Sequence, residues 1–178
     1  MRQRISFNDN WSFSLGDAPG AEQAGFDASA WRRVNLPHDW SIAGPFSEDN
    51  PSGGRGGYLP GGTGWYRKTF QLTEAELAGR VAVVFDGVYQ NCTVWVNGQR
   101  LGFHPYGYTS FAYDLTPHLH PGENLLAARV DHSLEPDSRW YSGSGIYRNT
   151  WLGNIYFRFV GCCILAIKHD VAYFCPFD

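Results

Sequence analysis

The chain has 178 residues and a formal net charge of −3, with 43% hydrophobic, 16% aromatic and 17% charged residues. This apolar and aromatic content excludes a disordered chain, and the mildly acidic charge argues against nucleic acid, whose phosphates need clustered lysine and arginine. With 21 glycines, 10 prolines and few charges, the composition predicts a soluble, all-β protein rich in strands and turns.

The N-terminus and the C-terminal segment bear on location. The first ten residues contain no apolar stretch of the kind found in secretory signals, so we expect a cytoplasmic protein. The nearly continuous apolar run at 155–167 is shorter than the roughly 20 residues that a membrane span needs, so we expect no membrane partner.

Strand signals begin near the N-terminus. Apolar side chains alternate between Phe7 and Leu15, which is typical of a half-buried strand. A second short strand is expected at 31–36, and Pro37 ends it because proline has no N–H for a ladder. The segment 45–64 is dense in glycine and proline, which predicts a long loop near a binding surface.

The middle of the chain consists of short strand candidates separated by turn signals. Asn97-Gly98 between alternating runs predicts a hairpin, because both residues accept positive φ. Many short strands without intervening helices indicate a β-sandwich, of which the jelly roll is a common version. The strand candidates are 64–72, 80–85, 93–96, 99–102, 111–115, 125–130 and 146–152, with a weakly helical turn at 73–77.

An ordered series of short motifs makes the interpretation more specific. The series resembles the N-terminal sugar-binding domain of family 2 glycoside hydrolases, particularly the β-galactosidase-like members, over residues from about 4 to 152. The motifs are Leu36-Pro37-His38-Asp39-Trp40, Gly57-Tyr58-Leu59-Pro60-Gly61-Gly62-Thr63-Gly64-Trp65-Tyr66, Phe85-Asp86-Gly87-Val88-Tyr89-Gln90-Asn91, Val94-Trp95-Val96-Asn97-Gly98, Gly107-Tyr108-Thr109-Ser110-Phe111 and Arg139-Trp140-Tyr141-Ser142-Gly143-Ser144-Gly145-Ile146-Tyr147-Arg148.

The resemblance implies a galactose-binding-like jelly-roll β-sandwich at the front of a longer enzyme. In the family, an immunoglobulin-like domain and a (β/α)8 barrel follow, and the barrel carries the paired glutamates that hydrolyse O-glycosyl bonds with retention. No glutamate of this chain matches those catalytic motifs, so we expect no catalytic residue and no hydrolysis by the chain alone. The chain is then a fragment of a carbohydrate-metabolising hydrolase that supplies part of the pocket for a β-galactoside-like substrate.

The resemblance also sets the expected domain boundaries. Residues 1–152 form the sugar-binding domain, and 153–178 are an atypical tail that differs from the family's continuation. The tail is interpreted as a frameshifted or truncated start of the next domain. A genuine short protein with its own appendage is the alternative.

Asp86 is the first candidate ligand residue. In the family, the aspartate at this motif position reaches the sugar site, and in sodium-dependent members it helps to bind the ion. A carboxylate suits both roles, because it accepts hydrogen bonds from hydroxyls and is a hard oxygen ligand. The resemblance therefore implies sodium or magnesium in the full-length enzyme and no other cofactor. The alternative is an aspartate that caps a turn.

Other candidates come from the neighbouring motifs. Asp39 could accept sugar hydroxyls while Trp40 stacks on a sugar ring, or the pair could be a turn-forming aspartate and a buried tryptophan. Asn91 offers both a donor and an acceptor. The segment Arg139, Trp140 and Tyr141 lies towards the barrel in the family, so it could contact substrate, another domain or only its own fold.

Two other functions remain open. A stand-alone carbohydrate-binding module predicts sugar binding by the isolated chain, lost when Asp86 is replaced by alanine. An unstable product without function predicts aggregation, since missing partner domains would expose apolar surface.

Overall fold

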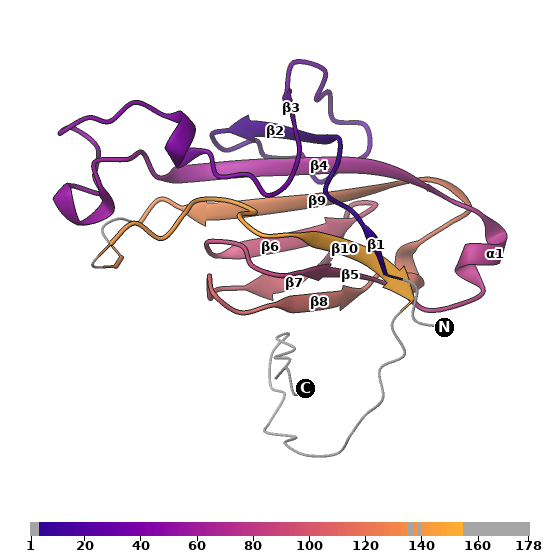
Figure 1. The fold of residues 1–178 in the computed structure, drawn as a ribbon. Helices are drawn as coiled ribbons and strands as arrows, with labels where there is room; N and C mark the ends of the chain where they lie inside the picture. Colours follow the sequence, from indigo (N-terminus) through magenta and orange to yellow (C-terminus); the bar gives the residue numbers. More distant parts are fainter. Residues whose placement is uncertain (1–3, 135–136, 139, 155–178) are drawn as a thin grey trace, which may run out of the picture.

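The computed structural model describes residues 4–134, 137–138 and 140–154, which form two antiparallel sheets packed face to face (Figure 1). The sandwich confirms the predicted all-β jelly-roll class. The six-stranded sheet has the order β3 (Arg32–Val34), β2 (Trp11–Leu15), β4 (Gly62–Leu72), β9 (Gly122–His132), β6 (Cys92–Val96) and β7 (Gln99–His104). The four-stranded sheet has the order β1 (Arg4–Ser6), β10 (Thr150–Asn154), β5 (Val81–Phe85) and β8 (Phe111–Asp114).

Helical structure in the described part is confined to short turns. The α-helix α1 (Glu74–Leu77) begins with a capping box, in which Glu76 N donates to Thr73 Oγ1 at 3.3 Å and Thr73 N donates to the Glu76 carboxylate at 2.8 Å. Three 3-10 turns lie in the connections, at Ser41–Ala43, Gly54–Gly56 and Thr116–His118. None of the described helices is long and apolar enough to cross a membrane.

The longest pairing joins β4 to β9. The two strands run antiparallel over eleven residue pairs, from Gly62 opposite His132 to Leu72 opposite Gly122. The strand predicted at 125–130 is therefore too short at both ends, because β4 supplies a hydrogen-bonding partner along its whole length.

The core fills the space between the two sheets. Along β6, Cys92, Val94 and Val96 are fully buried while the residues between them are partly exposed, as the period of two requires. From the opposite sheet, the stacked rings of Phe85 and Phe111 lie 5.0 Å apart. Removal of these side chains from water is the main force that holds the sheets together.

The last described strand begins later than predicted. β10 starts at Thr150 rather than Ile146, because Gly143 and Gly145 adopt φ angles of 90° and 112° and Gly145 pairs with Tyr89 in an isolated bridge. β10 also extends to Asn154, so the first two residues of the expected tail belong to the sheet. The rest of that tail, 155–178, lies outside the described residues.

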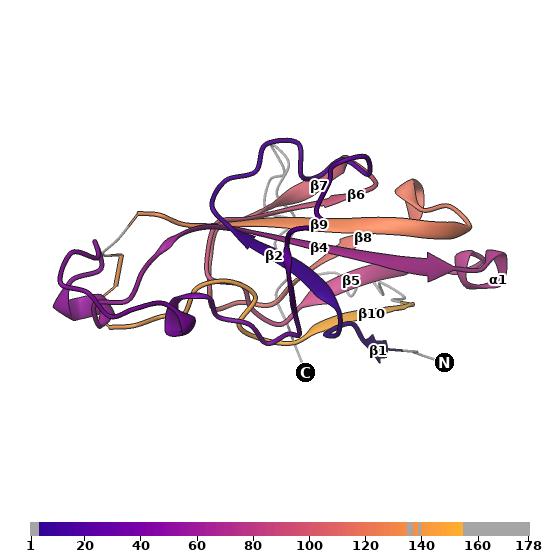
Figure 2. The same cartoon turned by 90° about the horizontal axis from the view of Figure 1, so that it is seen from above.

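Antiparallel pairing gathers four connections at one end of the sandwich. Strands β5, β7 and β9 end there, and β4, β6, β8 and β10 begin there, as the pairs Gly62–His132, Cys92–His104 and Thr150–Phe85 require. We call this the loop end and define it by the connections 35–61, 86–91, 105–110 and 133–149. Figure 2 shows these loops together at the end opposite α1.

Candidate functional site

The loop end brings together the residues singled out in the sequence. Asp39 and Trp40 follow β3, Asp86 and Asn91 lie between β5 and β6, and Tyr141 follows β9. Trp140 lies beside Tyr141 on the same connection, whereas Arg139 lies outside the described residues. The two segments that carry Asp39 and Tyr141 are held side by side by backbone hydrogen bonds, from His38 N to Ile146 O and from Trp40 N to Ser144 O.

Asp39 and Tyr141 form a direct hydrogen-bonded pair between these two segments. The Tyr141 hydroxyl donates to Asp39 Oδ2, and Ser41 N donates to Asp39 Oδ1 at 3.0 Å, which closes a turn. A Cβ atom on Gly143 would lie 3.4 Å from Asp39 Oδ2, so glycine leaves open space beside the carboxylate. Asp39 therefore forms the turn that one of the two interpretations expects. It is also only partly buried, so a sugar hydroxyl can reach its carboxylate.

Trp40 does not serve as a sugar-stacking platform in this structure. Its side chain is only 3% exposed, its ring stacks on Phe13 at 5.8 Å, and its Nε1 donates to Gly61 O at 3.1 Å. The apolar core covers the ring, and the structure therefore favours the interpretation of Trp40 as a packing residue. The accessible indole is that of Trp140, which is 66% exposed.

Asp86 links β1 to β10. Its Oδ1 accepts from Arg4 Nη2 at 3.0 Å and its Oδ2 accepts from Trp151 Nε1 at 2.8 Å. The Arg4 guanidinium lies over the Trp151 ring, 4.1 Å from its centroid. Both carboxylate oxygens are thus engaged within the domain, which gives Asp86 a structural role at the junction of β1 and β10.

The residues around Asp86 do not fit a sodium or magnesium ion. Within the described part of the chain, no three His, Cys, Asp or Glu side chains lie together as a metal-binding group. The charge next to Asp86 is the cation of Arg4, whereas a hard metal ion needs several oxygen ligands.

Asn91 also makes its side-chain contact inside the fold. It adopts a positive φ of 46°, its Nδ2 donates to Asp131 O at 3.1 Å, and its N–H donates to Pro105 O at 3.2 Å. These bonds hold the connection between β5 and β6 against β9 and β7.

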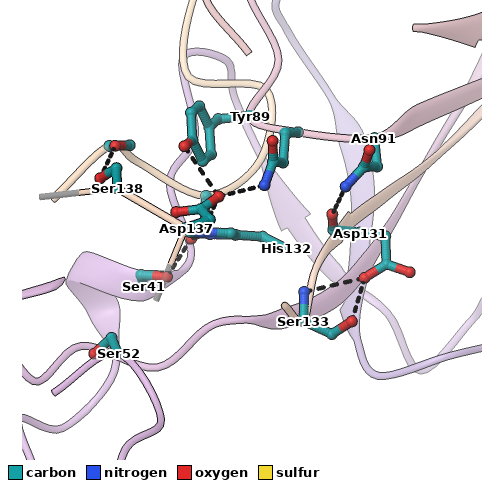
Figure 3. A network of polar contacts seen from close by, with 12 residues as sticks. Ser41, Ser52, Tyr89, Asn91, Asp131, His132, Ser133, Asp137 and Ser138 are labelled. Carbon is teal, nitrogen blue, oxygen red and sulfur yellow. Dashed lines mark hydrogen bonds and ion pairs between the residues drawn. The ribbon is translucent and has the colours of Figure 1, made fainter. Parts of the chain in front are cut away.

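A polar network centred on Asp137, in the connection after β9, was not predicted from the sequence. Figure 3 shows Tyr89 and His132 converging on this carboxylate. The Tyr89 hydroxyl donates to Asp137 Oδ2 at 3.0 Å, Gln90 Nε2 donates to the same oxygen, and His132 Nε2 lies 3.4 Å from it. Burial, followed by the proximity of Asp137, raises the pKa of Tyr89, so this phenol stays protonated and acts as a donor.

The other side of the His132 ring joins this network to the loop after β3. His132 is 3% exposed, and its Nδ1 lies 2.8 Å from Ser144 Oγ, which in turn lies 2.6 Å from Ser41 Oγ. The one local signal for this group was a histidine two residues after the predicted strand 125–130, and it gave no indication of the partners.

The network leaves too little space for a sugar. The hollow beside it measures about 10 Å³, roughly the room of one water molecule. The residues that line this hollow are Ser52, Gly56, His132, Asp137, Ser138, Trp140, Tyr141 and Ser142. The network therefore holds part of the connection 133–149 in place, and Trp140 and Tyr141 lie on the same connection.

His38, in the segment that carries Asp39, is neutral in the folded protein. Arg32 Nη2 lies 2.7 Å from His38 Nε2, and because a guanidinium only donates, Nε2 must accept. The proton then sits on Nδ1, which donates to the Tyr66 hydroxyl at 2.8 Å. Burial and the charge of Arg32 lower the pKa of His38 from 6.5 to about 4.

Comparison with known proteins places this arrangement in a family. Residues 58–155 match the model of the family 2 glycosyl hydrolase sugar-binding domain. The chain is 57% identical over 152 residues to the β-galactosidase BoGH2A of Bacteroides ovatus, covering 85% of this chain and 18% of that protein. It is 49% identical over 147 residues to a putative β-glucuronidase of Formosa agariphila, covering 83% of this chain and 14% of that protein.

A solved structure gives the same result. A β-glycosidase from Bacteroides vulgatus superposes with a TM-score of 0.82 and 47% identity, covering 84% of this chain and 20% of that one. The chain therefore spans about a fifth of the length of the proteins it matches. Sequence match, identity and fold agree, and the chain belongs to the sugar-binding domain family of the family 2 glycosyl hydrolases.

Proposed function

We propose that this domain forms one wall of the substrate pocket of a β-galactosidase-like enzyme that hydrolyses O-glycosyl bonds. The observation that carries the proposal is the pair of Asp39 and Tyr141 beside the exposed indole of Trp140, all on the loop end. An indole face stacks on the apolar face of a sugar, while a phenol and a carboxylate exchange hydrogen bonds with its hydroxyls.

The catalytic groups lie elsewhere in this proposal. No glutamate of this chain matches the family's catalytic motifs, and the relatives are about five times as long as this chain. An immunoglobulin-like domain and a (β/α)8 barrel are the partners that we propose for it. The barrel would supply the paired carboxylates of a retaining hydrolase.

A domain exchange tests this role. Residues 4–154 would replace the matching segment of the Bacteroides ovatus β-galactosidase, and hydrolysis of a nitrophenyl β-galactoside would be measured. We expect the exchanged enzyme to be active, and Tyr141→Phe to lower its kcat/KM about tenfold, which corresponds to about 1.4 kcal/mol of transition-state binding. Asp39→Asn should have a similar effect, because both substitutions remove one side of the pair.

Glu123→Gln provides the matched control, since this exposed carboxylate lies at the start of β9, far from the loop end. The proposal is wrong if the exchanged enzyme is active and both loop-end variants match the control.

A stand-alone carbohydrate-binding module is distinguished by titrating the isolated chain with a β-galactoside. The pocket-wall role predicts weak or no binding by the chain alone. A self-sufficient module predicts saturable binding that Trp140→Ala abolishes, because Trp140 is the exposed indole of the described loop end. Asp86→Ala is a poorer probe of binding, since its carboxylate is engaged with Arg4 and Trp151.

A further inference from the structure

An open pocket of about 460 Å³ lies at the loop end, on the side of the four-stranded sheet. It shares no lining residue with the hollow beside His132, and its volume falls within the range of about 300–1,000 Å³ that is usual for small-molecule sites. The pocket is lined by Pro37, Asp86, Ser110, Tyr147, Arg148 and Asn149.

The pocket offers hydrogen-bond donors that the described residues do not use. Arg148 is exposed and makes one hydrogen bond with the described residues, from Nη1 to Asp86 O at 3.3 Å, although a guanidinium has five N–H donors. Asn149 accepts from Asn8 Nδ2 through its Oδ1 at 2.9 Å, and its own Nδ2 donates to none of the described residues. A ligand that fits this lining must therefore bring acceptors.

The charge balance of the pocket favours an anion. The one carboxylate in the lining, Asp86, is already paired with Arg4 at 3.0 Å. The Ser110 hydroxyl donates to Asp86 O at 3.2 Å and so adds no negative group. The guanidinium of Arg148 is left as the uncompensated charge, and guanidinium groups bind carboxylates and sulfates with paired hydrogen bonds.

Gly87 leaves room for the side chain of Arg148. A Cβ atom on Gly87 would lie 2.6 Å from Arg148 Cδ and 3.0 Å from the Tyr147 hydroxyl, so a side chain at position 87 would force Arg148 to shift. The Tyr147 hydroxyl donates to Gly107 O at 2.9 Å, which fastens the pocket to the connection between β7 and β8.

That connection carries an exposed pair of aromatic rings. Tyr106 and Tyr108 are 56% and 44% exposed, and their rings meet edge to face at 5.6 Å. Exposed phenol rings next to a cationic pocket combine an apolar surface for a sugar ring with a partner for its charged substituent.

We propose that this pocket binds the anionic substituent of an acidic sugar, a carboxylate or a sulfate ester, through Arg148, with Tyr106 and Tyr108 contacting the sugar ring. The site is distinct from the Asp39–Tyr141 pair, and its test measures binding, so its failure leaves the proposed role as a pocket wall standing.

Calorimetric titration of the full 178-residue chain tests the site with matched sugars. We expect glucuronate or galactose 6-sulfate to bind at least tenfold more tightly than glucose or galactose, and the acid that binds identifies the substituent. Arg148→Met keeps the apolar stem and should weaken the acidic sugar at least tenfold. Arg100→Met, on the exposed part of β7, is the matched control and should leave binding unchanged.

Three results would overturn the inference. These are equal binding of acidic and neutral sugars, unchanged binding in a folded Arg148→Met variant, and inorganic sulfate binding as tightly as the acidic sugar, which would make this an anion site only. Gly87→Ala is a second variant that keeps all charges, and it should weaken the acidic sugar because the new methyl group displaces Arg148.

Discussion

His38 shows how a single side chain couples the fold to pH. Its folded pKa of about 4 lies below the ordinary value of 6.5, because burial and Arg32 disfavour the protonated ring. Between these two values the unfolded chain binds a proton that the folded chain does not, so stability rises with pH across this window. Above pH 6.5 the contribution is complete, and it is lost as the pH falls towards 4.

We expect the free energy of unfolding to fall by about 1–2 kcal/mol between pH 6.5 and 4 through this group, after allowance for the solvent screening of a half-buried ring. His38→Gln should flatten that part of the profile, because glutamine has no proton to bind. Urea unfolding of both proteins at several pH values measures the effect. Parallel profiles would show that other groups control the acid response.

At the residue scale, the turn-forming alternative for Asp39 could be predicted from the sequence, because such a turn depends only on adjacent residues. Asp39 was identified as a residue near the pocket or a turn, and it forms the turn with Ser41. Trp40 and Trp140 could not be distinguished, because exposure depends on whether Phe13 covers the ring, and that contact is formed by the packing of distant strands.

At the scale of elements, α1 depends on its cap. This helix has four residues, so the hydrogen bonds of the Thr73–Glu76 box are a large share of what holds it. Thr73→Ala should lower the free energy of unfolding by about 1 kcal/mol. Glu74→Gln, in the same turn but outside the box, should change it much less, and chemical denaturation of the two variants makes the comparison.

A substitution of Asp86 distinguishes a structural role at the junction of β1 and β10 from a role in binding an ion. Asp86→Ala leaves Arg4 and Trp151 without their acceptor, so we expect a loss of about 1–2 kcal/mol in unfolding free energy and faster amide exchange in β1. Asp49→Ala, in the connection before β4, is the control. Thermal stabilisation of the wild-type domain by millimolar sodium or magnesium, absent in Asp86→Ala, would contradict the junction role.

The sequence predicted elements best where turns are encoded by adjacent residues. Asn97 and Gly98 adopt φ angles of 49° and 80°, as the hairpin prediction required. The start of β10 was misplaced, because it depends on Gly145, where a Cβ would lie 2.2 Å from the Tyr66 hydroxyl. That contact joins residues far apart in the sequence and has no local pattern.

At the scale of the whole molecule, the loop end exposes several large apolar side chains to solvent. Large side chains on two of its segments are exposed, namely Ile42 at 65%, Phe46 at 74%, Leu134 at 78% and Trp140 at 66%. Exposed apolar groups of this kind mark interfaces and favour association.

We therefore expect the isolated domain to self-associate as its concentration rises, and Phe46→Ser to reduce this association. Ile5→Ser, on β1 and 49% exposed, is the control. Sedimentation velocity over a concentration series measures both. A wild-type domain that stays monomeric throughout would contradict the expectation.

The strand order, by contrast, could not be predicted from the sequence without the resemblance to a known family. The Asp137 network forms only because the end of β9 meets the connection after β5, and the two segments are 48 residues apart at Tyr89 and Asp137. Composition and periodicity specify that strands exist, but not which strands become neighbours.

The place of β10 has a consequence for synthesis on the ribosome. β10 is the last described strand, yet it lies between β1, the first strand, and β5. Until residues 150–154 have emerged from the ribosome, β1 has no neighbour and the exposed edge of β5 remains open. Folding of this domain during translation must therefore wait for almost its entire described length, and the nascent chain is a candidate for chaperone binding during that interval.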